Sequence, residues 1–228
     1  MVDIFSSLNI NLTKEQIRKF EEFAEILKEN NKLFNLTSIK EGRETQIKHF
    51  LDSSAGVDFF KHNSTIVEIG SGGGFPSVPL MILRNDLKFT LVEATEKKCI
   101  YLEKVRAALD LNCNILNERA EVLGKNPLYR QKFDYATARA VARLNVLCEY
   151  CLPFVKIGGS FIAYKGEANE EIKEAENSVK VLGGKIDSIK RYSLPEEEGD
   201  HCLIKIDKKI STPDIYPRGN GKERKRPL

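Results

Sequence analysis

A glycine-rich stretch follows the first strongly apolar, strand-like segment of the chain. Residues 67–76 read VEIGSGGGFP, with four glycines in five positions, and they continue the apolar segment TIVEIG at 65–70. Glycine lets the backbone adopt positive φ and lets a ligand approach closely, whereas a simple β-turn needs only one or two glycines. The stretch is therefore predicted to bind a ligand at the start of a helix that begins at Pro76.

The glycine spacing excludes two common nucleotide loops. The dinucleotide fingerprint G-x-G-x-x-G fails from Gly70 and from Gly72, because its third glycine falls on Phe75 or on Ser77. No Lys-Ser/Thr pair follows the loop, as a P-loop requires.

The loop has a different pattern, with an acidic residue before alternating glycines. Glu68-x-Gly70-x-Gly72-x-Gly74 resembles the loop of class I S-adenosylmethionine-dependent methyltransferases. In that pattern Glu68 would hold the methionine amino group. Glu93 ends the next apolar segment, 23 residues after Gly70, and a carboxylate there can accept both hydroxyls of an adenosyl ribose.

Hydrophobic periodicity predicts the elements around this loop. Residues 13–16 have the form of a capping box, followed by a helix over 14–31 and a second helical segment over 44–60. Apolar strand-like segments then alternate with helix-length segments, which predicts βαβ units and a parallel sheet. These strand-like segments are 65–70, 87–94, 112–117, 133–140 and 159–166, and a final pair at 185–194 and 201–207 predicts an antiparallel hairpin at the sheet edge.

The predicted fold class is therefore α/β, with a Rossmann-like sheet of five parallel strands plus a C-terminal antiparallel hairpin. We expect a helical extension over 1–62, a core domain over 63–209 and a basic tail over 210–228. No apolar run reaches the roughly 18–20 residues of a membrane helix, and the first residues do not look like a signal peptide. These features predict a cytoplasmic protein.

Cysteine and charge distribution add two further expectations. The five cysteines are scattered, which predicts reduced thiols, and Cys148-x-x-Cys151 is interpreted as one face of a core helix rather than a metal or redox site. The chain has a net charge of +3, but its last twelve residues alone carry +4. This end is either a solvated, disordered tail or an arm that binds the phosphates of a nucleic acid.

Several motifs in a fixed order make a more specific resemblance. They are FNLTSI (34–39), KHFLDS (48–53), EIGSGGGFPSVPL (68–80), RAE (119–121), TARAVARL (137–144), YKGE (164–167) and YPR…G…PL (216–228). Together they resemble the bacterial small-subunit ribosomal RNA guanine-N7 methyltransferases, the methyltransferase G or glucose-inhibited division protein B family. The resemblance covers nearly the whole chain.

The resemblance implies a cofactor, a substrate and a set of site residues. The cofactor is S-adenosyl-L-methionine, and its implied contacts are Gly70, Phe75, Ala120, Glu121 and Arg139. The implied substrate is one guanine in the decoding-region loop of 16S ribosomal RNA, free or in the 30S subunit. The protein is expected to act as a monomer without a metal or a membrane. Predicted substrate residues are Asn35, His49, Asp52 and Lys165, with Arg218, Arg224, Lys225 and Arg226 of the tail.

The residues after the fourth predicted strand favour N7 as the methyl acceptor. Many amino methyltransferases carry Asn/Asp-Pro-Pro-aromatic there, but this chain reads Thr137-Ala138-Arg139-Ala140. Guanine N7 has a lone pair and no proton, so its methylation needs no general base. Arg139 is predicted to hold guanine O6 during catalysis; the alternative is a structural pair with a carboxylate.

Two other functions stay open at this point. One is an NAD-dependent oxidoreductase with an atypical Rossmann loop. The other is a non-enzymatic RNA-binding or ribosome-assembly protein that keeps a vestigial cofactor loop. The presence of both acids, Glu68 and Glu93, counts against such decay.

Overall fold

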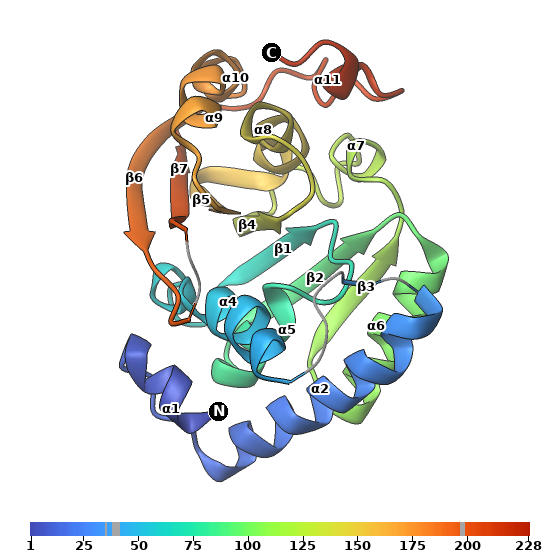
Figure 1. Ribbon diagram of the computed structural model, residues 1–228. Helices are drawn as coiled ribbons and strands as arrows, with labels where there is room; N and C mark the ends of the chain where they lie inside the picture. Colours follow the sequence, from blue (N-terminus) through green and yellow to red (C-terminus); the bar gives the residue numbers. More distant parts are fainter. Residues whose placement is uncertain (35, 38–41, 197–198) are drawn as a thin grey trace.

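A seven-stranded sheet forms the centre of the molecule (Figure 1). The structure is a computed structural model that describes residues 1–34, 36–37, 42–196 and 199–228. Its strands are β1 (Thr65–Ile69), β2 (Lys88–Glu93), β3 (Cys113–Asn117), β4 (Phe133–Arg139), β5 (Val155–Lys165), β6 (Gly184–Tyr192) and β7 (His201–Lys208), in the order β3-β2-β1-β4-β5-β7-β6. β1–β5 are parallel, and β7 runs antiparallel between β5 and β6. The predicted five parallel strands and C-terminal hairpin are confirmed.

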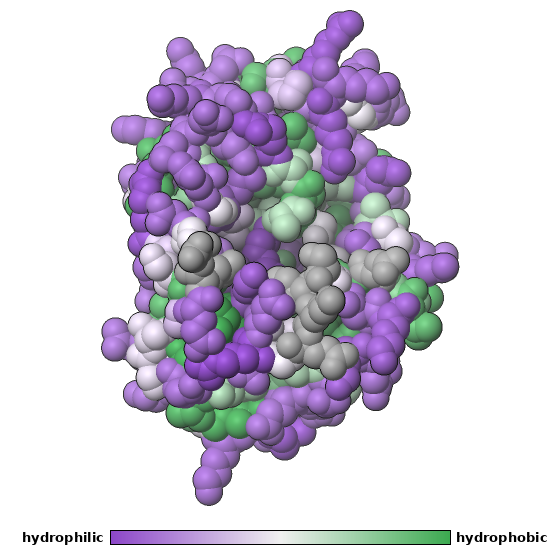
Figure 2. All heavy atoms as spheres, viewed as in Figure 1, coloured by the Kyte–Doolittle hydropathy of each residue, from purple (hydrophilic) through white to green (hydrophobic). Residues whose placement is uncertain are grey.

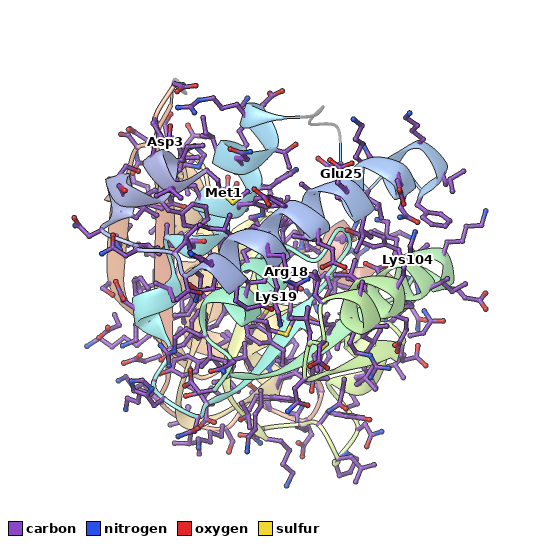
Figure 3. All side chains as sticks on the ribbon, turned by 90° about the horizontal axis from the view of Figure 1, so that it is seen from below. Met1, Asp3, Arg18, Lys19, Glu25 and Lys104 are labelled. Atoms are coloured by element: carbon purple, nitrogen blue, oxygen red, sulfur yellow. The ribbon has the colours of Figure 1, made fainter. Side chains whose placement is uncertain are left out.

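Helices cover both faces of the sheet and bury a separate apolar cluster on each. α2 (Lys14–Phe34), α5 (Ser77–Leu83) and α6 (Glu96–Ala108) pack on one face, and α7 (Ala120–Leu123), α8 (Leu144–Cys151), η4 (Leu152–Phe154), α9 (Asn169–Glu174) and α10 (Glu176–Val181) pack on the other (Figure 1). Figure 3 shows α2 lying alongside α6, where Lys104 pairs with Glu29 across 3.4 Å. Helices on both faces are typical of parallel sheets, because they shield the central strands from water.

The N-terminal helices pack directly on the sheet. α1 (Val2–Phe5) and η1 (Ser6–Leu8) precede α2, whose capping box is confirmed by reciprocal hydrogen bonds between Thr13 and Gln16. Phe23 of α2 and Leu80 of α5 belong to one buried cluster. Because one core spans the predicted boundary at residues 62 and 63, the division into 1–62, 63–209 and 210–228 stays a proposal.

The predicted helical segment over 44–60 is four short pieces rather than one helix. They are α3 (Arg43–Thr45), the π-helical η2 (Gln46–Leu51), α4 (Asp52–Ser54) and the 3₁₀ turn η3 (Val57–Phe59). Gly56 interrupts them, and a Cβ there would meet the Tyr164 hydroxyl, which donates to Ser53 O at 2.8 Å. π-helical turns are rare and occur often at functional sites.

The C-terminal tail is packed on the domain rather than forming a solvated, disordered end, whereas its role in binding phosphates stays a prediction. It contains the short helix α11 (Lys222–Lys225), and Thr212 and Glu223 are buried. Arg218 makes a two-pronged ion pair with the buried Glu149 at 2.6–3.1 Å. The tail packs on the domain because α8 contains a buried acid, Glu149, whose charge Arg218 neutralises. Within the described residues, no helix is long and apolar enough to span a membrane.

Candidate functional site

The glycine loop connects the carboxyl end of β1 to α5. Gly70, Gly72 and Gly74 have φ of +71°, +50° and +86°, values that favour glycine. A Cβ on Gly70 would clash with Val141, and one on Gly74 would clash with Val78, both at 2.7 Å. A Cβ on Gly72 would meet only Gly70 O, at 3.7 Å. Gly70 and Gly74 thus allow close packing, whereas Gly72 faces open space.

That open space is a cleft at the carboxyl ends of the parallel strands. It has two neighbouring compartments, which share Gly70, Lys98, Ala140 and Val141. The loop compartment, about 580 Å³, includes the glycine loop, and the α7 compartment, about 470 Å³, extends to α7 and the tail. Figure 2 shows a hollow near the middle of one face, with both hydrophilic and hydrophobic residues around it. Ligands of open α/β sheets bind at this end of the strands.

Besides Gly70, the α7 compartment contains three of the predicted cofactor residues. Glu93, Ala120 and Glu121 all line it. The Glu93 carboxylate accepts hydrogen bonds from Gly72 N at 2.9 Å and from Thr95 N at 2.8 Å. This acid therefore fixes the glycine loop while facing the compartment, and each oxygen keeps a further lone pair for a ligand.

Glu68 takes a different position from the one its motif suggests. Its carboxylate is fully buried and accepts hydrogen bonds from Ser77 N at 3.0 Å and Ser77 Oγ at 2.6 Å. Burial raises the pKa of Glu68 to about 7, although its bonds with Ser77 act in the opposite direction. The hydrogen bonds with Ser77 stabilise the start of α5. Within the described structure Glu68 lines neither compartment, and its contact with the methionine amino group stays a prediction.

Arg139 is the centre of a network in the loop compartment. Its guanidinium lies 4.9 Å from the centre of the Phe75 ring. Nη1 donates to Asp52 Oδ2 at 2.7 Å and to Lys48 O at 3.0 Å, and Nη2 contacts His49 Nδ1 at 2.8 Å. The sequence left a choice between a substrate contact and a structural pair with a carboxylate; the structure shows the pair, while direct contact with guanine stays a prediction.

The network also determines the protonation of His49. Arginine can only donate, so His49 Nδ1 accepts, and Nε2–H donates to Thr37 Oγ1 at 2.7 Å. Burial, followed by the positive charge of Arg139, lowers the pKa of His49 to about 3. The ring stacks on Phe75 with centroids 4.3 Å apart. His49 is therefore a neutral imidazole with both nitrogens engaged.

Asp52, like His49, has hydrogen-bond partners for both of its polar side-chain atoms. Besides Arg139, it accepts from the Tyr192 hydroxyl at 2.6 Å, and His201 Nδ1 lies 3.4 Å away. Burial raises the pKa of Asp52, but the hydrogen bonds with His201 and Tyr192 and the interaction with Arg139 outweigh it, so the net shift is downward. Asp52 is a charged anchor for Arg139 and a poor proton acceptor.

The remaining predicted substrate residues are not all brought to the cleft. Lys165 lines the loop compartment but pairs with Glu171 at 2.7 Å, and Asn35 lies outside the described residues. Arg224 lines the α7 compartment, whereas Arg218 pairs with Glu149. Lys225 and Arg226 are exposed on the tail.

Sequence reasoning missed several residues that line the cleft. Lys98 lines both compartments and has no ion pair among the described residues. His201 lines the loop compartment, and Tyr150 and Glu223 line the α7 compartment. The only signal for Lys98 is its place in the first turn of the helix after Glu93. The others come from distant segments that only the tertiary fold brings together.

The Cys148-x-x-Cys151 pair is part of the core, as predicted. Both thiols are fully buried and unlinked on α8, and burial raises the pKa of Cys148 to about 12. Across residues 1–34, 36–37, 42–196 and 199–228, no group of three His, Cys, Asp or Glu could hold a metal ion.

Comparison with solved structures supports the fold. The chain matches "M. jannaschii TYW2 in complex with AdoMet" with a TM-score of 0.54 at 13% identity, covering 75% of this chain and 79% of that one. It matches the "Methanococcus jannaschii fibrillarin pre-rRNA processing protein" with a TM-score of 0.53 at 16% identity, covering 66% and 69%. The chain therefore shares its α/β fold with these proteins.

Sequence comparison is more specific. The chain is 44% identical to "Ribosomal RNA small subunit methyltransferase G" of Leuconostoc mesenteroides, covering 100% of this chain and 97% of the relative. The protein of the same name from Acetivibrio thermocellus is 42% identical, with 100% and 95% covered. Residues 16–198 match the GidB family model, described as rRNA small subunit methyltransferase G. The chain therefore belongs to the GidB family.

Proposed function

We propose that this protein is an S-adenosylmethionine-dependent methyltransferase that methylates N7 of a guanine in 16S ribosomal RNA. The observation that carries the cofactor assignment is Gly72, whose left-handed backbone donates to Glu93 and faces open space in the compartment that Arg139 also lines. The names of the relatives supply the ribosomal substrate, and the AdoMet complex of a structural neighbour supports the cofactor. We further infer a monomer that works in the cytoplasm, where small ribosomal subunits are.

The residues of the cleft fit the cofactor. The nucleoside part suits the α7 compartment, with the ribose hydroxyls at Glu93 and the base near Ala120 and Glu121. The methionine part suits the open side of Gly72 in the loop compartment. When bound, S-adenosylmethionine supplies an electrophilic methyl group.

The chemistry of the loop compartment supports N7 as the acceptor atom. Both ring nitrogens of His49 are engaged, and Asp52 is held charged by Arg139, so neither is free to remove a proton from a substrate. Guanine N7 has no proton to lose. Lys48, Lys98 and Lys165 line the same compartment, and cations there favour the approach of an RNA phosphate backbone.

A methylation assay tests this function directly. Purified protein with radiolabelled S-adenosylmethionine is expected to label 16S RNA, protein-free or as the 30S subunit, and borohydride–aniline cleavage should locate the mark at N7 of one guanine. Binding of the cofactor product without labelling of either RNA would favour the assembly-protein reading. Binding of NADH instead of S-adenosylhomocysteine would favour the oxidoreductase.

The cofactor assignment predicts the behaviour of Gly72→Val. The side chain would enter the space that the methionine part needs, and a non-glycine residue at positive φ adds backbone strain. We expect calorimetry to show no binding of S-adenosylhomocysteine. Gly158→Val is the matched control, because Gly158 has φ +85° and open space but lies on an exposed part of β5. Loss of binding in both variants, or in neither, would contradict the assignment.

A further inference from the structure

The C-terminal segment forms one wall of the α7 compartment. Gly221, Glu223 and Arg224 line it together with Ala120 and Glu121 of α7, which the resemblance already assigns to the cofactor. Figure 1 shows α11 beside α8 and α7, although its residues are about a hundred positions further along the chain than α7. The compartment is therefore completed by a segment that lies outside the sheet.

Two consecutive residues of α8 hold this segment in place. Glu149, 1% exposed, accepts from the backbone N–H of Arg218 at 2.7 Å and from its guanidinium at 2.6–3.1 Å. Tyr150 donates its hydroxyl proton to Glu223 Oε1 at 2.9 Å. An ion pair with a buried carboxylate and a buried hydrogen bond thus hold the segment before and at Glu223, so contacts within the protein are enough to position it.

Glu223 has an unused acceptor. The residue is 1% exposed, and its Oε2 is buried without a hydrogen-bond partner within the described residues. An acceptor left in this state is destabilising, and more so for a charged group. A ligand that brings an N–H donor to this wall would satisfy it.

We propose that Glu223 accepts a hydrogen bond from the exocyclic amine of the adenine of the cofactor, so that the C-terminal segment selects the base. The proposal rests on the proposed function, because it takes the ligand to be an adenosyl compound. Adenine has a donor at this position, whereas hypoxanthine has an oxygen that a carboxylate repels. Glu121 lines the same compartment from α7, and the test therefore includes it.

The test compares two ligands that differ at this one group. Calorimetry is carried out with S-adenosylhomocysteine and S-inosylhomocysteine on the full chain and on Glu223→Gln, Glu121→Gln and Lys222→Gln. A glutamine at 223 keeps one oxygen for Tyr150 and replaces the other with an amide N–H₂, a donor. Lys222→Gln is the control on the same helix, because Lys222 is exposed and is not part of the compartment wall.

We expect Glu223→Gln to bind S-adenosylhomocysteine about tenfold more weakly, the usual contribution of one hydrogen bond to a charged group. Its preference for the adenosyl over the inosyl ligand should disappear or reverse, while Lys222→Gln behaves like the wild type. If Glu223→Gln loses a cooperative thermal transition, Glu223→Asp makes the same comparison, since it keeps the charge but withdraws the carboxylate by one methylene.

Three results would overturn the proposal. Unchanged affinity and preference in Glu223→Gln would do so and would leave the proposed function intact. Loss of preference in Glu121→Gln alone would move the contact to α7. Failure of the wild type to bind either ligand would overturn this proposal together with the cofactor assignment.

Discussion

Arg139 connects the groups that define the loop compartment. One guanidinium contacts Asp52, Lys48 O and His49 and lies over Phe75. Its position at the end of the fourth strand could be predicted from the sequence, as could the neighbourhood of His49 and Asp52. Their mutual pairing could not, because residues about 90 positions apart give no local signal of contact. The position of Glu68 differs from its predicted position for a similar reason, because the motif gives no sign that Ser77 is its partner.

This network predicts that Arg139→Lys impairs methyl transfer more than cofactor binding. A lysine keeps the charge but cannot reach Asp52, Lys48 O and His49 together. The imidazole of His49, which stacks on Phe75, would then lose its fixed orientation. Single-turnover methylation with saturating cofactor and RNA should slow by roughly tenfold to a thousandfold. Arg143→Lys, at an exposed pair with Glu174, is the matched control. Near-normal single turnover in Arg139→Lys would show that the planar fork is dispensable.

The buried Glu68 predicts a pH-dependent contribution to stability. Burial raises the pKa of Glu68 from 4.5 to about 7, so between these values the folded state holds a proton that the unfolded state lacks. Its contribution is fully present below pH 4.5 and is lost as the pH rises towards 7. His49, with its pKa lowered from 6.5 to about 3, acts in the opposite direction, since its contribution is lost as the pH falls below 6.5.

The difference between Glu68→Gln and the wild type isolates the first contribution. The variant should gain about 3 kcal/mol in unfolding free energy relative to the wild type between pH 4.5 and 7, from about 1.4 kcal/mol per pKa unit. Urea melts at several pH values measure this, with Glu25→Gln on the exposed side of α2 as the control. A difference that does not vary with pH would mean that Glu68 is charged throughout the range.

At the scale of elements, segments with a regular hydrophobic period were predicted well, whereas irregular helical segments were not. The seven strands lie close to their predicted ranges, since apolar alternation and runs are strong local signals. The 44–60 segment broke into short pieces because a π-helical turn and the Gly56–Tyr164 contact depend on neighbouring elements. The helical segment that follows β5 is divided into α9 and α10 at Ala175. α11 is four residues long, too short for a periodic signal.

The capping box of α2 has a second role that its sequence does not reveal. Gln16 Oε1 accepts from Thr13 N, and its amide donates to Ile82 O and Leu83 O at 3.3 Å, at the end of α5. Gln16→Ala should therefore cost about 2 kcal/mol in urea unfolding, against about 1 kcal/mol for Thr13→Ala. Lys14→Ala, exposed in the same turn, is the control. Equal losses for Gln16→Ala and Thr13→Ala would mean that the bridge to α5 contributes nothing.

At the scale of the whole molecule, the net positive charge is concentrated at the C-terminal end of the chain. In the fold, some of these cations make contacts within the protein and others are exposed. Arg218 neutralises Glu149, and Arg224 donates to the Tyr150 hydroxyl at 3.2 Å. Lys225 and Arg226 are exposed and have no ion pair among the described residues. Composition alone gave the net charge of the tail but not this division, because the acid that fixes Arg218 lies 69 residues earlier.

The exposed residues Lys225 and Arg226 predict the salt dependence of RNA binding. Each phosphate contact contributes a slope of about 0.7–0.9 in log affinity against log salt, so Lys225→Gln/Arg226→Gln should flatten the slope by up to about 1.4–1.8. S-adenosylhomocysteine affinity should not change, because neither residue lines the α7 compartment. Truncation is a poorer test, since it would leave Glu149 buried and unpaired and would remove Glu223. Lys14→Gln/Lys19→Gln, on α2 across the sheet, removes the same charge elsewhere (Figures 1 and 3). Equal slopes for the tail variant and the wild type would assign the tail to packing alone.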